Sequence, residues 1–276
     1  MSSLVVNTNL SAIQAYNNLN ATDTAMSKSI SELSSGLAIQ TAADGPAQYV
    51  ISQALQSQAN GYQTAISNAQ DGTSLIQTAS GALNQISDIL QTMNQLALTS
   101  ANGATNDTTS LSANNAEFQD LVSAITQIAV TTTYGTTQLL TGTFTGQVLQ
   151  VGAFDLTNQQ ITLSLSAADA GTLGLTGVSV ASATSAQAAI SAVQAAIAQV
   201  DSIEAQAGAI QNQLQSIVAN LTVGQQNLAA ASSQLVDVNF AQQMTTFSTD
   251  QILMQTGTAM LSQAQQAPAL VLKLIP

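Results

Sequence analysis

Carboxylates are the only side chains in this sequence whose spacing is compatible with acid–base chemistry. Asp201 and Glu204 lie three residues apart in a segment of helical period, and Glu117 and Asp120 repeat that spacing. Each pair therefore projects from one face of a helix. Hydrolysis of a glycosidic bond, which uses two carboxylates, needs them on opposite sides of a cleft. We therefore interpret both pairs as solvated helix faces.

The other residue types exclude most remaining chemistry. The chain has no His, Cys or Arg, and its 2 basic residues are Lys28 and Lys273. A His-based triad, a Cys nucleophile and a zinc site of nitrogen and sulfur ligands are thus excluded. The glycines follow no phosphate-binding pattern, and Asp107, Asp155 and Asp169 lack the spacing of a calcium loop. We expect no enzymatic activity, no cofactor and no metal site.

Composition predicts a helical chain with a neutral polar surface. Only 6% of the 276 residues are charged, against about a quarter in typical soluble proteins. The net charge is -12, so a basic surface for nucleic acid is absent. The 45% hydrophobic content argues against a disordered chain, and with 3% aromatic residues the interior must be aliphatic. A surface of Gln, Asn, Ser and Thr repels its neighbours weakly, which suits dense assembly.

Segments that direct a chain into or across a membrane are not predicted. The N-terminal sequence has no basic region followed by a long apolar run, so we expect no cleaved signal peptide. Polar residues interrupt every apolar stretch before it reaches the ~20 residues that span a bilayer. We therefore expect no membrane span and, if the protein is exported, a route without a cleaved signal.

The two ends of the chain show the strongest helical pattern. Apolar residues of the first helix recur at spacings typical of a coiled-coil seam, at Met26, Ile30, Leu33 and Leu37. The last helix carries one seam through Phe240, Met244, Phe247, Met254 and Leu261, and a second through Leu253, Met260, Ala264, Val271 and Leu274. A helix that is apolar on more than one side must be buried. We therefore predict that other copies of the chain cover these helices.

This interpretation gives a set of candidate packing residues on the two terminal helices. They are Leu10, Ile13, Met26, Ile30, Leu33, Leu37, Phe240, Phe247, Leu253, Met260, Leu261, Leu270, Val271 and Leu274.

The sequence pattern in the middle of the chain predicts further helices and one β region. Gly36 can turn the chain out of the first helix, and Asp44 and Pro46 are typical of an N-cap and a first helical turn. Helical period then continues to about Ser100 and returns at 113–129 and from Ser185 onward. Residues 130–180 alternate and are rich in Thr and Gly, which predicts two or three β-hairpins. The fold class is mainly α: an antiparallel coiled-coil bundle of the two terminal segments, with a small β-hairpin patch.

Four segments resemble bacterial flagellin: LSSGLAI, SNAQDGTSLIQTASGALNQISDILQTMNQLALTSANG, AGAIQNQLQSIVANL and ILMQTGTAMLSQAQQAPALVL. They stand in the family's order, and the resemblance covers the chain outside about residues 140–180. It implies that 1–37 and 235–276 form the inner coiled-coil tube of a filament, and that 38–234 form a surrounding helical tube. Residues 33–44 would link the two, with Gly36, Asp44 and Pro46 in or beside that link.

The resemblance also implies a function and partners. The chain is expected to be a structural subunit that polymerises into the flagellar filament for swimming, outside the cell, after passing through the flagellar export apparatus. Its partners would be further copies of itself, an export chaperone on the C-terminal helix, the filament cap and the hook-junction proteins. The alternative is a hook–filament junction protein, which shares the terminal helices.

Overall fold

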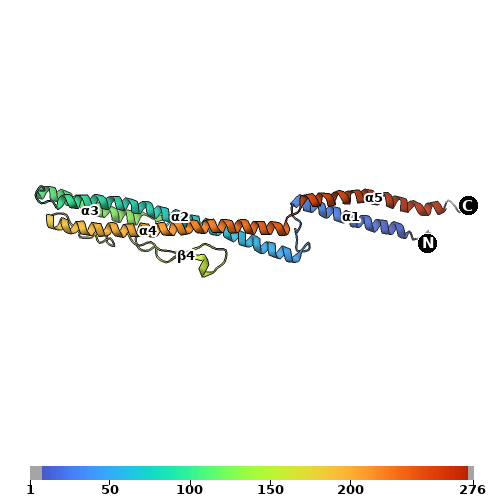
Figure 1. Ribbon diagram of the computed structural model, residues 1–276, viewed down its shortest axis with the longest axis horizontal. Coiled ribbons are helices and arrows are strands. Elements are labelled where there is room, and N and C mark those ends of the chain that lie inside the picture. Colours follow the sequence, from blue (N-terminus) through green and yellow to red (C-terminus); the bar gives the residue numbers. More distant parts are fainter. Residues whose placement is uncertain (1–7, 273–276) are drawn as a thin grey trace. The chain divides into compact units, whose positions relative to one another are not determined.

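The computed structural model describes residues 8–272, and its fold is mainly α, as the sequence predicted (Figure 1). Its long helices are α1 (Leu10–Ser35), α2 (Pro46–Ser100), α3 (Thr108–Thr131), α4 (Ala183–Val236) and α5 (Phe240–Leu272). Short strands lie between α3 and α4, namely β1 (Thr133–Tyr134), β2 (Thr137–Gln138), β3 (Gln147–Gln150) and β4 (Gln160–Leu163), with one 3-10 turn at Thr157–Gln159.

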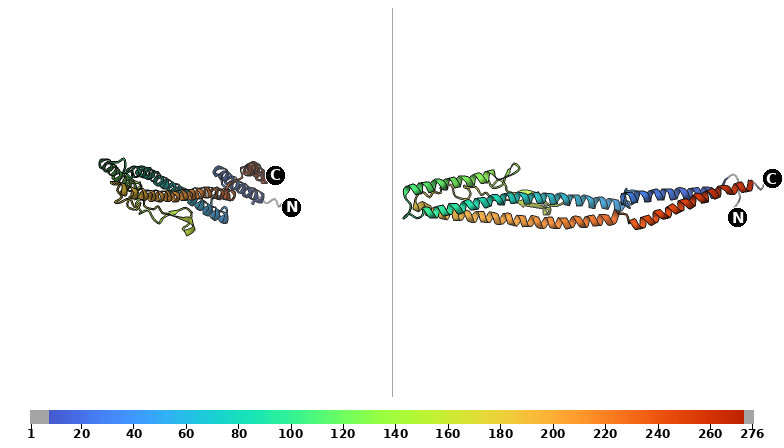
Figure 2. Two further views of the ribbon diagram at one scale, coloured as in Figure 1. Left: turned by 60° about the vertical axis from the view of Figure 1, so that its left-hand side comes forward. Right: turned by 90° about the horizontal axis from the view of Figure 1, so that it is seen from above.

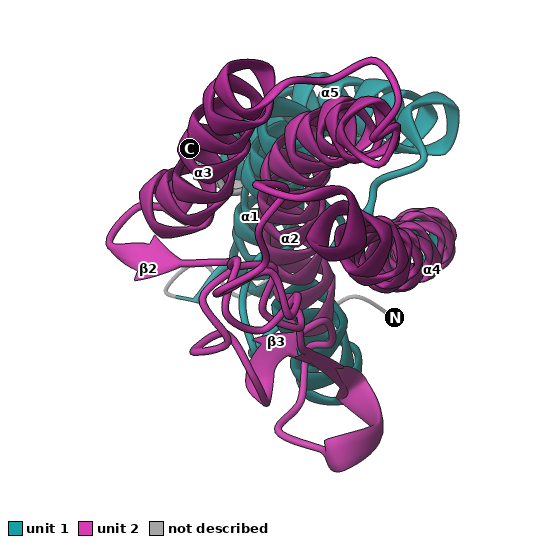
Figure 3. Ribbon diagram, turned by 90° about the vertical axis from the view of Figure 1, so that its left-hand side faces the viewer, with its two compact units in different colours: residues 1–57, 227–276 teal, residues 58–226 magenta. Residues whose placement is uncertain are grey.

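The chain divides into two compact units (Figure 3). Unit 1 contains the residues up to 57 and those from 227 onward, and unit 2 contains residues 58–226. Unit 1 therefore includes the first turns of α2 and the last turns of α4 in addition to α1 and α5. The resemblance implied boundaries after residue 37 and before residue 235, which lie near the ends of α1 and α4. The two compact units divide inside α2 and inside α4.

In unit 2, α2 and α4 lie side by side and run in opposite directions (Figure 2). The amide of Gln225 on α4 donates to the side-chain oxygen of Gln63 on α2 at 2.8 Å. Further along α2, a Cβ at Gly72 would lie 3.4 Å from Leu214 on α4. The numbering rises on one helix as it falls on the other, so the pair is antiparallel. The third helix, α3, folds back along α2 after the short turn at 101–107 (Figure 2).

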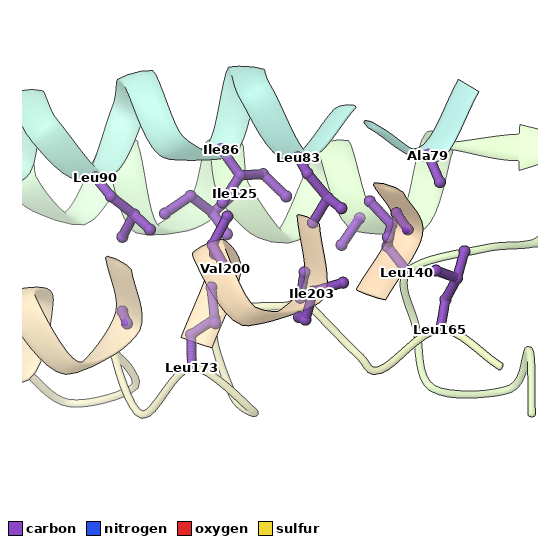
Figure 4. Close-up of a cluster of buried hydrophobic side chains, with 14 of the residues drawn as sticks. Ala79, Leu83, Ile86, Leu90, Ile125, Leu140, Leu165, Leu173, Val200 and Ile203 are labelled. Atoms are coloured by element: carbon purple, nitrogen blue, oxygen red, sulfur yellow. The ribbon is translucent and has the colours of Figure 1, made fainter. Parts of the chain in front are cut away.

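The core of unit 2 is formed by the apolar stripes of these three helices. Leu83 and Ile86 on α2 point toward Ile125 on α3 and toward Val200 on α4 (Figure 4). All four side chains are fully buried. The stripe on α2 recurs at helical spacing, which is why the sequence predicted one face of this helix as buried. Phe118 and Phe144 are the buried aromatic side chains of this core, and Ala, Leu, Ile and Val fill most of the space.

The region between α3 and α4 only partly matches its prediction. Within the described residues it holds two antiparallel hairpins, β1–β2 and β3–β4, and Ile161, Leu163 and Leu165 face inward together as expected. Residues 164–182, however, form neither strand nor helix: Leu165, Leu173 and Leu175 are buried, while the turn residues at 171, 172, 176 and 177 are exposed. Leu165 and Leu173 lie in the core, and Leu165 N–H donates to the Phe144 carbonyl at 3.0 Å.

In unit 1, α1 packs along α5 (Figures 1 and 2). The chain leaves α1 at Gly36, whose φ of 75° is the left-handed conformation that glycine adopts without cost. Leu37 then pairs with Asp237, and Ala38 N–H donates to the Val236 carbonyl at 2.7 Å. The sequence predicted helical period running from 185 almost unbroken into the last helix, but residues 237–239 separate α4 from α5 because they take part in this pairing.

Candidate functional site

The α1–α5 pair is the candidate functional site, because most of the candidate packing residues belong to it. The two helices are antiparallel: Asn9, just before α1, donates to the Ala264 carbonyl at 2.7 Å, and Gln243 donates to the Ser29 hydroxyl at 3.0 Å. The residues of each helix that lose most exposure are spaced three and four apart. On α1 they are Ala12, Ala15, Leu19, Thr22, Met26, Ser29 and Leu33, and on α5 they are Gln243, Phe247, Asp250, Met254, Gly257, Leu261 and Ala264. We call these two rows the seam.

The seam is narrow and partly polar. Small residues allow the helices to approach closely, since a Cβ at Gly257 would lie 3.1 Å from the Leu19 side chain. Ser29 is buried and hydrogen-bonded to Gln243. Asp250 also lies in the seam, and one of its carboxylate oxygens is buried without a hydrogen-bond partner. A seam with so few large apolar residues leaves most of the apolar surface of both helices outside it.

The structure places the candidate residues in two groups. Met26, Leu33, Phe247 and Leu261 are half-buried in the seam, and Leu37 is half-buried in the pairing with Asp237. The second group has exposed side chains on the outer faces of the pair, with 63% exposure for Leu10, 64% for Met260 and 49% for Leu253. We call this second group, together with three residues that the sequence did not single out as candidates, the outer face: Leu10, Ile13, Tyr16, Ile30, Phe240, Met244, Ile252, Leu253 and Met260.

The three additional outer-face residues are Tyr16, Met244 and Ile252. Met244 was placed in the same predicted seam as Phe247, but it is exposed, and Gln243 beside it belongs to the half-buried row instead. Tyr16 follows Leu10 and Ile13 at intervals of three, and this spacing was the signal that would have identified it. Leu270 and Val271 lie in α5, but their side chains are not described, and Leu274 is outside the described residues.

One ionic cluster ties the end of α1 to the link that follows it. Lys28 Nζ lies 3.3 Å from an Asp44 carboxylate oxygen and 3.7 Å from Glu32, which forms the i, i+4 pair. The other Asp44 oxygen accepts from the hydroxyl and the backbone N–H of Thr41, at 2.8 and 3.0 Å. These hydrogen bonds, together with Lys28, hold the pKa of Asp44 below its ordinary value.

The helix-start prediction is therefore correct for Pro46 and wrong for Asp44. Pro46 is the first residue of α2, where its missing N–H leaves no hydrogen bond unmade. Gly45, not Asp44, immediately precedes that helix. The Asp44 carboxylate accepts a hydrogen bond from Thr41 and forms an ion pair with Lys28, so it stabilises the link and does not cap α2. The lysine that makes this tie lies on a neighbouring helix, which sequence spacing alone did not reveal.

The carboxylate pairs of unit 2 lie on helix surfaces. Glu117 and Asp120 are exposed on α3, and Asp201 is exposed on α4. Glu204 is half-buried, and one of its oxygens has no hydrogen-bond partner. Burial, and to a smaller extent the negative charge of Asp201, raise the pKa of Glu204. Among residues 8–272, no three acidic side chains are grouped as a metal site requires, and no helix there has the length and hydrophobicity to span a membrane.

Two regions of the chain, one toward each end, match a known protein family. Residues 6–145 match the bacterial flagellin N-terminal helical region, and residues 190–275 match the bacterial flagellin C-terminal helical region. The chain is 39% identical to a flagellin of Halalkalibacterium halodurans, over 99% of this chain and 100% of that protein. It is 34% identical to a flagellin of Bacillus subtilis, over 98% and 99% of the two chains.

Relatives from a different group of bacteria and solved structures agree with these matches. A flagellar filament 33 kDa core protein of Treponema phagedenis is 32% identical over 99% of this chain and 100% of its own. The crystal structure of Bacillus cereus flagellin covers 60% of this chain and 94% of its own, with a TM-score of 0.51 and 28% identity. A putative flagellar hook-associated protein of Vibrio parahaemolyticus, at a TM-score of 0.59 and 14% identity over 70% and 100% of the chains, shares the fold.

Proposed function

This chain belongs to the bacterial flagellin family, and we propose that the outer face of its α1–α5 pair is the surface through which copies join into a filament. The protein is a structural subunit of the flagellar filament, since its full-length relatives are flagellins and filament core proteins. The observation that supports the proposed surface is the exposure of large apolar side chains, such as Leu10, Leu253 and Met260, on helices that carry few charges.

The energetic argument rests on how much apolar surface the α1–α5 pair leaves in water. The outer face holds nine large residues whose exposed fractions are about half or more. Fully burying one such side chain contributes about 1.5–3 kcal/mol. Burying even half of them against neighbouring copies gives several kcal/mol per subunit, which is comparable with the stability of a whole domain at about 5–15 kcal/mol. Soluble monomers rarely leave so many large apolar side chains in contact with water on one pair of helices.

We assign the terminal helices to the inner tube of the filament and the helices of unit 2 to the surrounding tube. The family resemblance supports this assignment, with 1–37 and 235–276 inside, 38–234 outside and 33–44 as the link. The contacts of the link support its role as a joint. Leu37 pairs with Asp237, so both places where the chain passes between the tubes are hydrogen-bonded to each other.

The proposed partners follow from the same assignment. Further copies of the chain are the main partner, and the filament cap and the hook-junction proteins contact copies at the ends of the polymer. An export chaperone would cover the C-terminal helix, since α5 carries exposed Phe240, Leu253 and Met260 before assembly. We propose that the subunit reaches the extracellular filament through the flagellar export apparatus without a cleaved signal peptide.

The alternative of a hook–filament junction protein has less support. The likeness to a putative hook-associated protein is 14% in sequence and concerns the fold alone. Relatives that match over their whole length include flagellins and filament core proteins.

Seeded polymerisation tests the proposed surface. Purified protein added to short filament seeds should elongate them, and protein lacking residues 267–276 should remain soluble and fail to elongate, because Leu270, Val271 and Leu274 would be lost from the interface. The truncated protein should retain the helical content of the remaining chain by circular dichroism. Normal filaments from the truncated chain would show that the C-terminal end of α5 is outside the assembly interface.

A further inference from the structure

Four dipeptides of this chain place Asn or Asp directly before glycine: Asp44–Gly45, Asn60–Gly61, Asp71–Gly72 and Asn102–Gly103. At such a pair the backbone nitrogen of the glycine can attack the side-chain carbon Cγ of the residue before it, because glycine has no Cβ to hinder the approach. The attack requires a backbone that can bend and a side-chain carbonyl that is not ionised. The four pairs meet these two requirements to different degrees.

Two of the pairs lie inside α2, which protects them. In a helix each backbone N–H bonds to the carbonyl four residues earlier, so the nitrogen reaches the preceding side chain only after local unfolding. Both glycines are also packed against the β3–β4 hairpin and the loop that joins its strands. A Cβ at Gly61 would lie 2.6 Å from the Ala153 Cβ, and a Cβ at Gly72 would lie 2.7 Å from the Leu149 side chain. Asn60 and Asp71 should therefore be inert in the folded protein.

A third pair, Asp44–Gly45, lies outside the helices, but its carboxylate is protected. One Asp44 oxygen accepts from the Thr41 hydroxyl at 2.8 Å, and the other lies 3.3 Å from Lys28 Nζ. These contacts favour the ionised form. A carboxylate resists a nucleophile, because the attack would place a second negative charge on the same group. Asp44 should therefore be inert as well.

The fourth pair, Asn102–Gly103, lies in the turn at 101–107 that joins α2 to α3 (Figure 2). Asn102, Gly103 and Ala104 are exposed to solvent. Gly103 N–H donates to the Ala101 carbonyl at 3.1 Å, so this bond must open before the nitrogen can react. It closes a three-residue turn and is no part of a helical ladder. Loops open and close within nanoseconds to microseconds, far faster than amide chemistry, so the Gly103 nitrogen is available for reaction.

The side chain of Asn102 is folded toward that nitrogen. Ala104 N–H donates to Asn102 Oδ1 at 3.4 Å, and a contact with the second residue ahead brings Cγ over the intervening Gly103 nitrogen. The same N–H points at the oxygen on which negative charge develops during the attack, which stabilises the tetrahedral intermediate. The Asn102 side chain is a neutral amide, so, unlike the Asp44 carboxylate, it can accept a nucleophile.

From these observations we infer that Asn102 is a site of covalent modification, at which water converts the side-chain amide to aspartate or isoaspartate. The Gly103 nitrogen loses its proton to a solvent base and bonds to Asn102 Cγ. The bond from Cγ to Nδ2 then breaks, and the amide leaves as ammonia. Water opens the resulting ring in one of two ways. Attack at Cγ gives aspartate with the main chain unchanged, whereas attack at the backbone carbonyl carbon gives isoaspartate, whose main chain runs through Cβ and Cγ. One water is consumed, one ammonia is released, and nothing is oxidised or reduced.

The product should disturb the turn in which it forms. It adds a negative charge just beyond the C-terminal end of α2, where the helix dipole disfavours an anion. The Asn106 amide donates to the carbonyls of Thr99 and Asn102, at 2.6 and 3.0 Å. In isoaspartate the carbonyl at position 102 becomes a free carboxylate on a branch of the chain, so this turn must rearrange. The modification requires no second copy of the chain, and it therefore goes beyond the proposed function.

Ageing of the full-length protein tests the inference, with Asn60 as an internal control on the same chain. Folded protein is kept in mildly alkaline buffer and digested with pepsin in acid, where the amide nitrogen keeps its proton and digestion adds no further reaction. Mass spectrometry of the peptides should show amide loss at position 102 at least about tenfold faster than at position 60, because α2 must first open locally. In urea the two rates should agree within about threefold, since both segments are then unfolded. Equal rates in the folded protein, or a slower rate at position 102, would overturn the inference.

The variant Gly103→Ala tests the ring-closing step. The φ of Gly103 lies outside the left-handed region, and a Cβ there would lie 3.4 Å from the Ala183 Cβ, an ordinary contact, so the variant should melt like wild type. The added Cβ hinders the attack, so amide loss at position 102 should slow at least about tenfold while the rate at position 60 stays the same. In wild type, an isoaspartyl methyltransferase should label position 102. An unchanged rate in Gly103→Ala, or amide loss without isoaspartate, would mean that water attacks the side chain directly, and would overturn the mechanism. Protein that fails to elongate seeds still reports both rates, so this inference and the proposed function fail independently.

Discussion

The apolar side chains of unit 2 and those of the α1–α5 pair in unit 1 are buried to very different degrees. In unit 2, side chains from three helices and the 164–182 segment meet in a core in which Leu83, Ile125 and Val200 have no access to water. In the α1–α5 pair, the seam residues are half-buried, and large side chains such as Leu10 and Met260 lie in water. A two-helix pair has no third element to cover its outer sides.

This difference separates two uses of apolar sequence. Unit 2 uses its apolar stripe to fold, and its helices need no further copy for burial of their core. The α1–α5 pair uses part of its apolar surface to hold two helices together and presents the rest to other copies. The substitutions below should therefore affect folding in one unit and assembly in the other.

The largest expected effect is on assembly, from a single charge placed either on the outer face or in the seam of α5. Leu253→Asp places a carboxylate on the outer face, and it should abolish seeded elongation. The monomer's free energy of unfolding should stay within about 0.5 kcal/mol of wild type. Leu261→Asp places the charge in the seam, so it should abolish elongation and also weaken the α1–α5 pair. Electron microscopy of seeded samples and circular dichroism of monomers measure the two effects. Filaments of wild-type heat stability from Leu253→Asp would show that this side chain faces solvent in the polymer.

Truncating one leucine in each unit should separate their contributions to folding. Leu83→Ala removes a fully buried side chain from the core of unit 2 and should cost about 2–5 kcal/mol. Leu19→Ala removes a half-buried side chain from the seam and should cost about 1 kcal/mol. Urea titration monitored by hydrogen exchange assigns each loss to its unit. Equal losses at the two positions would contradict the contrast between a closed core and an open seam.

Much of the helical organisation was predictable from the sequence, because apolar spacing determines which face of a helix is buried. The α2 helix was predicted from Pro46 to about Ser100, and the structure has it at those bounds. The α3 helix begins earlier than predicted, at Thr108, because Asp107 accepts from the Ser110 N–H and caps it. The spacing of apolar residues indicates the buried face of a helix. It does not indicate the residue at which the helix begins, because that depends on the side chain that caps it.

Contacts between segments distant in sequence were not predictable. The 164–182 segment lacks a regular period, and its burial depends on α3, where the Asn115 side-chain oxygen accepts from Val180 N–H at 2.9 Å. The sequence likewise identified apolar faces on both terminal helices without deciding which residues face the seam. That choice is made by small residues such as Gly257, which set where the two helices approach closely.

A pair of glycine substitutions contrasts the joint in unit 1 with a helix in unit 2. Gly36→Ala forces alanine into a left-handed conformation, and should destabilise the α1–α5 pair by about 1 kcal/mol. Gly81→Ala lies inside α2 with nothing within 4 Å of the new Cβ, so it should stabilise unit 2 by about 0.5–1 kcal/mol. Thermal melting of the two variants should move in opposite directions. A stabilised Gly36→Ala would show that the chain need not turn sharply out of α1.

The smallest expected effects are those of two acids in unit 2 whose pKa values are shifted in opposite directions. Burial raises the pKa of Glu204, and one of its oxygens has no partner. For Asp169 burial also opposes ionisation, but hydrogen bonds from Thr172 and Gly171 outweigh it and lower the pKa. An acid with a raised pKa destabilises the fold when ionised, and this loss disappears as the pH falls through its folded-state pKa. An acid with a lowered pKa contributes stability above its unfolded-state pKa, and that contribution is lost as the pH falls through its folded-state pKa.

Glu204→Gln should therefore stabilise unit 2 at pH 7, and Asp169→Asn should destabilise it, each by less than about 1 kcal/mol because both side chains retain contact with water. Both differences from wild type should shrink toward acidic pH: for Glu204→Gln because the wild-type carboxyl becomes protonated and neutral, and for Asp169→Asn because the wild-type carboxylate stops accepting its hydrogen bonds. Melting temperatures of the three proteins between about pH 3 and pH 8 measure this. A Glu204→Gln variant less stable than wild type at pH 7 would mean that the carboxylate of Glu204 is engaged by a partner, and that unit 2, like the Lys28–Asp44 tie in unit 1, uses its acids as structural ties.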